Sequence, residues 1–312
     1  MAAMDEDTPV APERNSVRRP SLSVVVSTYE WPEALEAVLS GFADQTDDAF
    51  ELVVADDGSG ATTAEAVDRW RIAFGDRLSH VWQEDAGFRL ARVRNLGALA
   101  IRGDYVVFVD GDCIPRRGFI ASVRRATAPG WFLAGKRVHL SPTLSRAAFD
   151  DRVRIARWSA ASFWWHRRQV HTWVDLTPRD RRRPWRPSLP DFVPHGNAYG
   201  FLMAMYRTDF EAVNGFDMRY VGWGEQDVDL AVRLRRRGLR SGWAGPRSTM
   251  LHLSHASNMP LDRPTWWLLQ ETLGSNHVEA IEGVKELRLE SEVSHHRADS
   301  ASLSRRTRRL GE

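Results

Sequence analysis

Two aspartates separated by one glycine follow a strongly apolar run in the first half of the chain. Asp110-Gly111-Asp112 comes directly after the run at 105–109, whose apolar and β-branched composition is typical of a buried strand. Carboxylate oxygens suit a hard divalent cation, Mg²⁺ or Mn²⁺, which often also binds phosphate oxygens. The pattern favours a metal site that neutralises a diphosphate. The alternative is a simple turn, because Asp and Gly are common turn residues.

A second acidic pair follows another apolar run, at 52–55. Asp56 and Asp57 precede Gly58-Ser59, and a carboxylate at a strand end can accept a hydrogen bond from a uracil or a ribose. The alternative is a turn that caps the next helix. Thr62 and Glu65 have the spacing of a capping box, which favours that alternative locally.

A third group contains three acidic residues, Glu225, Asp227 and Asp229, which follow Gly222-Trp223-Gly224 at the start of a predicted helix. Two glycines around a tryptophan predict a sharp loop that exposes an aromatic ring, and the C–H face of a sugar can pack on such a ring. A carboxylate beside the ring can act as general base toward a sugar hydroxyl. Helix capping by acidic side chains is the alternative, and it accounts for one of the acidic residues in this region.

Histidines and arginines offer further candidate ligands. A neutral imidazole from His252 or His255 can complete a metal site that two carboxylates begin, although most single histidines are structural. Arg89, Arg92 and Arg94 lie in one short segment, and a guanidinium suits diphosphate recognition. The alternative is that these arginines are only solvated.

The elements that position these residues alternate along the chain. Strands are predicted at 22–27, 52–55, 78–82 and 105–109, with helices after the first two strands, over 90–101 and from 225 onward. This order predicts an α/β fold with a mostly parallel sheet flanked by helices and a less regular second half. Ligands of such sheets bind beyond the carboxyl ends of the strands, where both acidic motifs fall.

Composition excludes several classes of protein. The 312 residues carry a formal net charge of +2, which is too small to indicate a nucleic-acid partner. Cys113 is the single cysteine, so no intrachain disulfide can form. Residues 1–20 lack the apolar core of a signal peptide, and no window approaches a transmembrane span, so a cytoplasmic location is expected.

The Pro- and Arg-rich segment 181–194 predicts a loop that closes over a site.

Taken together, the motifs resemble the family-2 inverting glycosyltransferases of the GT-A fold, over about residues 21–256. Four segments carry the resemblance: 24–29, 53–59, 94–97 with 108–112, and 222–227. The last is similar to the C-terminal module of galactosyltransferases and N-acetylgalactosaminyltransferases, and Arg94-Asn95 is similar to bacterial chondroitin-polymerase-type domains.

The composition and the resemblance together predict a division of the chain. Residues 1–20 contain proline and charge without periodicity and are expected to form a disordered tail, and the resemblance implies that 21–115 form a half that binds the nucleotide sugar. Residues 116–256 then form the acceptor-binding and catalytic half of the same GT-A domain. Residues 257–312 complete the chain as a helical extension and a basic tail.

The resemblance also implies roles for individual residues. Asp227 is the expected base, and Glu225 is a second catalytic candidate whose role stays open because Gln226 stands where the family often has an acidic residue. The metal, Mn²⁺ or Mg²⁺, is expected at Asp110, Asp112 and His252, with His255 as second choice. Sugar or acceptor contacts are assigned to Asn197, Trp223 and Gly224. The nucleotide sugar is expected to bind Thr28, Tyr29, Glu30, Asp57, Arg94, Asn95, Asp110 and Gly111.

The implied reaction is a metal-dependent single displacement. It moves a sugar of the galactose, GalNAc or GlcNAc type from a UDP-sugar to a hydroxyl of a saccharide or lipid-linked acceptor. One rival is a nucleotidyltransferase, which typically needs a Gly-rich, basic loop after the first strand, unlike 27–31. Another rival is an inactive carbohydrate-binding or scaffold protein on the same fold. The presence of Asp110, Asp112, Asp227 and a histidine argues against this alternative.

A separate hypothesis concerns the membrane. Trp164-Trp165, Trp266-Trp267 and the basic tail at 305–309 combine aromatic and basic residues, which predicts peripheral contact with the inner face of an anionic membrane. The alternative is that these tryptophans belong to the core and the tail is solvated.

Overall fold

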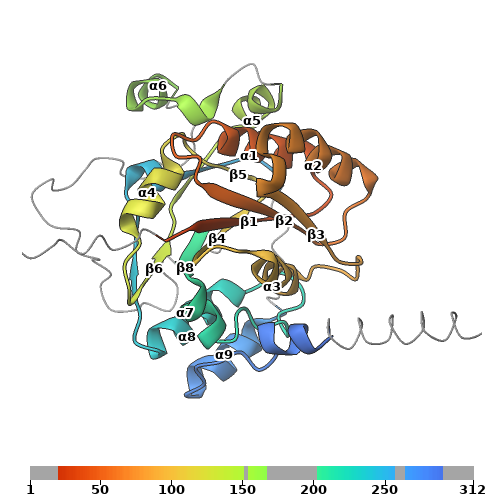
Figure 1. Cartoon of the computed structure of the whole chain (residues 1–312), viewed down its shortest axis with the longest axis vertical. Helices are drawn as coiled ribbons and strands as arrows, with labels where there is room; N and C mark the ends of the chain where they lie inside the picture. Colours follow the sequence, from red (N-terminus) through yellow and green to blue (C-terminus); the bar gives the residue numbers. More distant parts are fainter. Residues whose placement is uncertain (1–19, 151–153, 167–201, 257–263, 291–312) are drawn as a thin grey trace, which may run out of the picture.

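A large sheet with helices on both faces forms the body of the molecule (Figure 1). The computed structural model describes residues 20–150, 154–166, 202–256 and 264–290. In that part of the chain the large sheet has seven strands in the order β3-β2-β1-β4-β8-β6-β9, and a second sheet has the order β5-β10-β7.

The large sheet contains β1 (Leu22–Thr28), β2 (Phe50–Asp56), β3 (Leu78–Trp82), β4 (Tyr105–Asp110), β6 (Trp131–Ala134), β8 (Leu202–Tyr206) and β9 (Arg240–Gly242). The second sheet contains β5 (Cys113–Ile114), β7 (Arg137–His139) and β10 (Met250–His252). The helices are α1 (Pro32–Ala43), α2 (Ala61–Phe74), α3 (Leu90–Ala100), α4 (Phe119–Ala126), α5 (Pro142–Phe149), α6 (Ala160–Trp165), α7 (Arg207–Ala212), α8 (Gln226–Arg236) and α9 (Trp266–Gly274). Short 3-10 turns occur at η1 (Gly75–Arg77), η2 (Ile155–Arg157) and η4 (Pro246–Ser248).

The four predicted strands lie side by side in the large sheet and are parallel to one another. β1 lies between β2 and β4 and is parallel to both, and β3 continues the parallel order on β2. Beyond β4, β8 runs in the opposite direction and is antiparallel to both β4 and β6, whereas β9 is parallel to β6. The expected α/β architecture with a mostly parallel sheet is therefore confirmed.

Side-chain alternation divides the interior into two cores. Val24 and Val26 of β1 pack with the face covered by α1, α2, α4 and α5, whereas Val25 packs with the face covered by α3, α7, α8 and α9. All three are at most 1% exposed. Burial of such a side chain stabilises the fold by roughly 1.5–3 kcal/mol, so strands with both faces covered read as continuous apolar runs.

The predicted capping box at the start of α2 is wrong. The helix begins at Ala61 with Gly60 as its N-cap, so Thr62 already lies inside the first turn. The backbone N–H of Gly60 instead donates to Glu30 Oε1 at 2.6 Å. The carboxylate of Glu30, from the turn after β1, thus accepts the N-cap hydrogen bond that the capping-box pattern assigned to Glu65.

Several predictions fall on residues outside the described ranges: Asn197, the segment 181–194, the tail 1–19 and the basic C-terminal residues. The division of the chain into functional halves also stays a prediction. Within the described ranges, no helix combines the length and the apolar character that a membrane crossing requires.

Candidate active site at the carboxyl ends of the strands

The carboxyl ends of the three central parallel strands are tied together by backbone hydrogen bonds. Asp57 donates its N–H to the carbonyl oxygen of Thr28 at 3.0 Å, and Gly111 donates to that of Ser27 at 2.7 Å. A Cβ at Gly111 would stand 2.6 Å from the Ser27 oxygen, so only glycine permits this approach. The two acidic motifs therefore meet at the end of β1.

The two aspartates of the first motif have different environments. Asp56 is fully buried and bonded to His80 at 3.1 Å and to the Ser59 N–H at 2.8 Å; burial raises its pKa, but these hydrogen bonds outweigh burial and leave it lowered. Burial raises the pKa of Asp57, although the Arg89 N–H and Gln83 also bond its carboxylate. Asp56 therefore stabilises the turn through its hydrogen bonds, whereas the carboxylate of Asp57 accepts hydrogen bonds from Gln83 and Arg89 of the 83–89 loop.

The residues after β1 form a turn beside this motif. Glu30 has a positive φ of 44°, and its N–H donates to Ser59 Oγ at 2.8 Å. Tyr29 is 49% exposed, and its hydroxyl donates to Asp85 at 3.1 Å. The predicted nucleobase residues thus lie at neighbouring strand ends, with Thr28 and Tyr29 at the end of β1 and Asp57 after β2. Their binding role remains a prediction.

Arg94 and Asn95 point to different partners. Arg94 is 1% exposed, and its Nη2 donates to Asp110 Oδ1 at 2.6 Å. Asn95 is fully buried: its Nδ2 donates to the Phe216 carbonyl at 2.8 Å, and its Oδ1 accepts the Phe216 N–H at 2.9 Å. Asn95 therefore fastens the 214–217 turn to α3, and any contribution of its side chain to donor binding stays a prediction.

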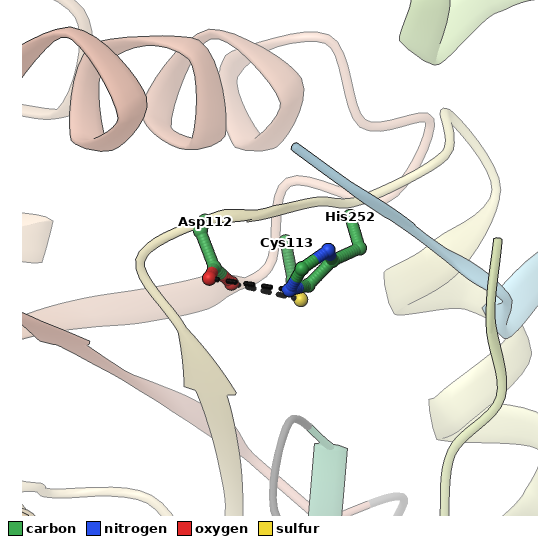
Figure 2. A group of neighbouring side chains, drawn as sticks. All are labelled: Asp112, Cys113 and His252. Atoms are coloured by element: carbon green, nitrogen blue, oxygen red, sulfur yellow. Dashed lines mark hydrogen bonds and ion pairs between the residues drawn. The ribbon is translucent and has the colours of Figure 1, made fainter. Parts of the chain in front are cut away.

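The second carboxylate of the Asp-Gly-Asp motif meets two histidines. Asp112 Oδ2 lies 3.3 Å from His252 Nε2 and 3.2 Å from His255 Nε2. Figure 2 shows Asp112 on the turn after β4, with Cys113 and His252 converging on its carboxylate. His252 reaches this position because β10 pairs with β5, which places it opposite Cys113. Asp110 and Asp112 thus face different partners, an arginine and two imidazoles.

The electrostatics of this cluster follow from its burial and charge. Burial raises the pKa of Asp112, but its hydrogen bonds with His252 and His255 outweigh burial and hold it far below its usual range. The bond to Asp112 raises the pKa of His255. Burial lowers the pKa of His139 to about 4, and its ring centroid lies 4.6 Å from that of His252. The carboxylate is therefore ionised at neutral pH, as a metal ligand must be.

The donor set fits a divalent cation. A carboxylate oxygen and an imidazole nitrogen converge, and the other ring nitrogen of His252, Nδ1, is buried with no hydrogen-bond partner among the described residues. Asp112 and His252 would hold the ion, as the sequence predicted, and His255 lies equally near. The ligand roles of Asp110, Asp112 and the histidines remain predictions.

The Gly-Trp-Gly loop leads into α8 beside the 83–89 loop. Gly222 has a φ of +94°, and its N–H donates to the Phe88 carbonyl at 2.7 Å. Trp223 is 40% exposed, as the sharp-loop prediction required. A Cβ on Gly224 would stand 1.6 Å from Thr265 Oγ1, so the loop packs closely on the residues before α9.

The acidic residues of this loop have separate tasks. Glu225 is the N-cap of α8, and Asp227 lies in its first turn, partly exposed. Asp229 is fully buried and accepts from Arg233 at 2.6 and 2.8 Å and from Thr272 at 2.7 Å. Asp229 is therefore structural, which leaves Asp227 and Glu225 as the candidate catalytic carboxylates.

Some residues near the candidate site were not predicted from the sequence. Gln83 and Phe88 touch it through Asp57 and Gly222, and His139 and Trp31 touch it through the histidines. None of them lies in a recognisable motif. The pairing of β10 with β5 and β7 that assembles the histidine cluster involves strands over 100 residues apart in sequence, so no local pattern could reveal it.

Two family models match this chain. Glycosyl transferase family 2 matches residues 23–128, and the N-terminal domain of galactosyltransferase matches 189–256. The first contains the two acidic strand ends, and the second contains the Gly-Trp-Gly loop and both histidines. The matches therefore cover both sides of the candidate site.

Curated relatives and a solved structure agree with the family matches. Validoxylamine A glucosyltransferase of Streptomyces hygroscopicus subsp. jinggangensis is 29% identical over 247 residues, covering 70% of this chain and 52% of that protein. Chondroitin synthase of Escherichia coli is 34% identical over 102 residues, covering 32% and 15%. The crystal structure of S. aureus TarS aligns with a TM-score of 0.54 at 15% identity, covering 75% and 37%, and supports the fold.

The fold and the arrangement of the strand ends are similar to those of GT-A type glycosyltransferases. Residues 23–128 match glycosyl transferase family 2, and a galactosyltransferase-like segment at 189–256 follows that match. The chain spans about half the length of the curated relatives that match it over most of its own sequence.

Proposed function

We propose that the protein is an inverting glycosyltransferase that transfers a sugar from a UDP-sugar to an acceptor hydroxyl in one metal-dependent displacement. One observation carries the proposal: the two acidic strand ends meet at β1, and the Gly-Trp-Gly loop is bonded to the loop that holds Asp57. Donor-binding and base candidates from opposite ends of the sequence thereby become neighbours through adjoining loops.

In this proposal each residue has one task. Thr28, Tyr29 and Asp57 bind the nucleoside, and Arg94 orients Asp110. Asp112 and the histidines would hold the divalent cation, which would supply positive charge to neutralise the diphosphate leaving group. Trp223 holds the sugar or acceptor. Asp227 takes the proton from the acceptor hydroxyl, whose oxygen bonds to the anomeric carbon from the face opposite the diphosphate. The bond from that carbon to the diphosphate breaks, and the nucleoside diphosphate leaves with the electron pair.

Substrates are proposed from chemistry and from the relatives. An exposed tryptophan beside the proposed base favours a saccharide acceptor, and the relative named as chondroitin synthase favours donors of the hexosamine or uronic acid class. The relative named as a glucosyltransferase adds UDP-glucose to the donors worth testing.

The test is calorimetric binding of a nucleotide-sugar panel with Mn²⁺ and then with EDTA, followed by assay of nucleoside diphosphate release with saccharide acceptors. Metal-dependent binding of one UDP-sugar and release of UDP on transfer support the proposal. Release of pyrophosphate would instead indicate a nucleotidyltransferase. Absence of binding to every donor, with and without metal, contradicts the transfer function.

A location at the inner face of a membrane is proposed as a second property. Trp165 is 76% exposed and Trp267 is 59% exposed, which supports their availability for an anionic lipid surface. Sedimentation with anionic vesicles tests this property, with a variant truncated after residue 290 as the comparison. Failure of the full chain to sediment contradicts it.

A further inference from the structure

Gln83, the first residue after β3, has a buried side chain with two partners of opposite kind. It is 5% exposed. Its Nε2 donates to Asp57 Oδ1, and its Oε1 accepts from Arg92 Nη1 at 2.8 Å. A guanidinium can only donate and an ionised carboxylate can only accept, so a single orientation of the amide satisfies both partners. Arg92 therefore determines which end of the amide faces Asp57.

Arg92 is itself held in place on α3. It lies in the first turn of that helix, and its Nη2 donates to Glu290 Oε2 at 3.0 Å. Two positions further along the same helix, Arg94 donates to Asp110. One helix thus acts on both acidic strand ends, through Arg94 directly on the second and through Arg92 and Gln83 on the first.

The carboxylate of Asp57 is held at both of its oxygens. Oδ1 accepts from Gln83, and Oδ2 accepts the N–H of Arg89 at 2.8 Å. Each oxygen can accept one more hydrogen bond. Burial raises the pKa of Asp57 and so does the charge of Asp85, whereas the bonds from Arg89 and Gln83 and the charge of Arg89 favour the ionised form. Loss of the Gln83 bond therefore favours a protonated carboxyl, which donates as well as accepts.

The two forms of this carboxyl group suit different nucleobases. Uracil carries an N–H at ring position 3, and an ionised Asp57 can accept from it. Cytosine has an unprotonated nitrogen at that position and an amino group beside it. A protonated carboxyl can donate to that nitrogen and accept from the amino group, whereas an ionised carboxylate faces the lone pair of the nitrogen unfavourably. A site built to accept from one donor discriminates against a base that lacks it.

We propose that Gln83, oriented by Arg92, is a positioning residue that holds Asp57 as the acceptor for the ring N–H of uracil, and that the nucleotide site thereby prefers uridine over cytidine diphosphates. The inference rests on the proposed binding of a UDP-sugar at Asp57, and it adds the residues that set the base preference. Neither Gln83 nor Arg92 needs to touch the nucleotide for this role, because both act through the carboxylate.

The first experiment measures binding of UDP and of CDP to the full chain by calorimetry with Mn²⁺ present. Wild type is expected to bind UDP at least about tenfold tighter than CDP, because a hydrogen bond to a charged group contributes about that factor. Gln83→Met keeps the length of the side chain but removes its donor and acceptor, so the ratio should fall to within about threefold. CDP affinity should stay equal or rise, whereas a disordered pocket would lose both nucleotides.

The second experiment changes the group that orients the amide. In Arg92→Met the amide of Gln83 is free to turn its oxygen toward Asp57, so the preference for UDP should fall as it does in Gln83→Met. Arg92→Lys keeps a charged donor and should give a ratio between those of wild type and Arg92→Met. This pair of variants tests the inference even if Gln83→Met does not fold.

Gln45→Met is the matched control, because it makes the same substitution elsewhere in the chain. Gln45 precedes β2, whereas Asp57 follows it, and the Gln45 side chain makes three hydrogen bonds with the backbone of other residues. Its replacement should lower the free energy of unfolding, measured in urea, and leave the ratio of UDP to CDP affinity as in wild type. The comparison separates loss of stability from loss of base preference.

Three results overturn the inference: equal binding of UDP and CDP by wild type, a wild-type ratio in Gln83→Met or Arg92→Met, or an equal fall of the ratio in Gln45→Met. Failure of the proposed function is distinguishable. If wild type binds neither nucleotide, with or without Mn²⁺, the function and the inference fail together. If a UDP-sugar is transferred while Gln83→Met keeps the ratio, the function stands and the positioning role fails. If no donor turns over while Gln83→Met loses the preference, the transfer function fails and the positioning role stands.

Discussion

The backbone N–H of Gly222 donates to the carbonyl oxygen of Phe88 at 2.7 Å, although the two residues are 134 positions apart. Phe88 precedes Arg89, whose N–H bonds Asp57, and Gly222 precedes the loop that leads to Asp227. One hydrogen bond thus joins the loop of the proposed nucleoside pocket to the loop of the proposed base. The position of the proposed base relative to the proposed nucleoside pocket therefore depends on this contact.

Removal of the proposed base should separate transfer from donor binding. Asp227→Asn keeps the shape of the side chain but cannot accept the acceptor proton, so kcat should fall by roughly 10²–10⁴-fold. Donor affinity, measured by calorimetry with Mn²⁺, should stay within about twofold of wild type. Wild-type turnover in this variant would remove Asp227 from the base role.

Strain at Gly222 should affect activity more than strain elsewhere. Gly222→Ala and Gly238→Ala each place a Cβ at a φ of +94°, and neither position has a neighbouring atom closer than 3.8 Å to that Cβ. Each should lose about 1 kcal/mol or more in free energy of unfolding. Only Gly222→Ala should also lower kcat/KM. Equal activity of the two variants would show that the Phe88–Gly222 contact does not position the site.

The buried ion pair between Asp229 and Arg233 in α8 should be a large contributor to stability. Asp229→Asn leaves Arg233 as a buried cation without its partner, with both side chains 1% exposed in the native pair. The free energy of unfolding, measured in urea, should fall by about 3–5 kcal/mol. Glu36→Gln removes the exposed partner of Arg69 and should change it by less than about 1 kcal/mol. A loss of similar size in both variants would contradict a special role for the buried pair.

Glu51 should make stability depend on pH. Burial raises the pKa of Glu51, but hydrogen bonds from Ser23 and from Arg102 outweigh burial and leave it below its usual value. Because the folded pKa is lowered, this stabilisation is present above the usual glutamate pKa and is lost as the pH falls through the lowered one. Glu51→Gln should therefore reduce the free energy of unfolding at pH 7 and have little effect in strong acid.

The control for this pH dependence is Glu65→Gln, at an exposed position on α2. Its difference from wild type should be small at both pH values. The expected signature is a gap between Glu51→Gln and wild type that closes as the pH is lowered. A gap of constant size would mean that Glu51 acts through packing and not through its charge.

The sequence by itself determined the parallel half of the fold and the place of its acidic residues. Strands such as 105–109 are covered on both faces, so they appear as unbroken apolar runs, and the motif that follows must lie at a strand end. The helix after Pro32 was equally readable, since its buried residues Leu35, Val38, Leu39 and Phe42 recur at helical spacing. These features depend on neighbours in sequence.

The partners of the site residues were decided by tertiary structure alone. Whether His252 or His255 faces Asp112 depends on the pairing of β10 with β5, and the structure brings both within 3.3 Å. Asn95, a predicted donor-binding residue, bonds the backbone of Phe216, which lies 121 positions away. At the start of α2, the sequence predicted capping by Thr62, but the N–H of Gly60 bonds the distant Glu30 instead, because the folded chain brings Glu30 close. A polar side chain takes whichever partner the folded chain brings within about 3 Å, and sequence spacing cannot specify that partner.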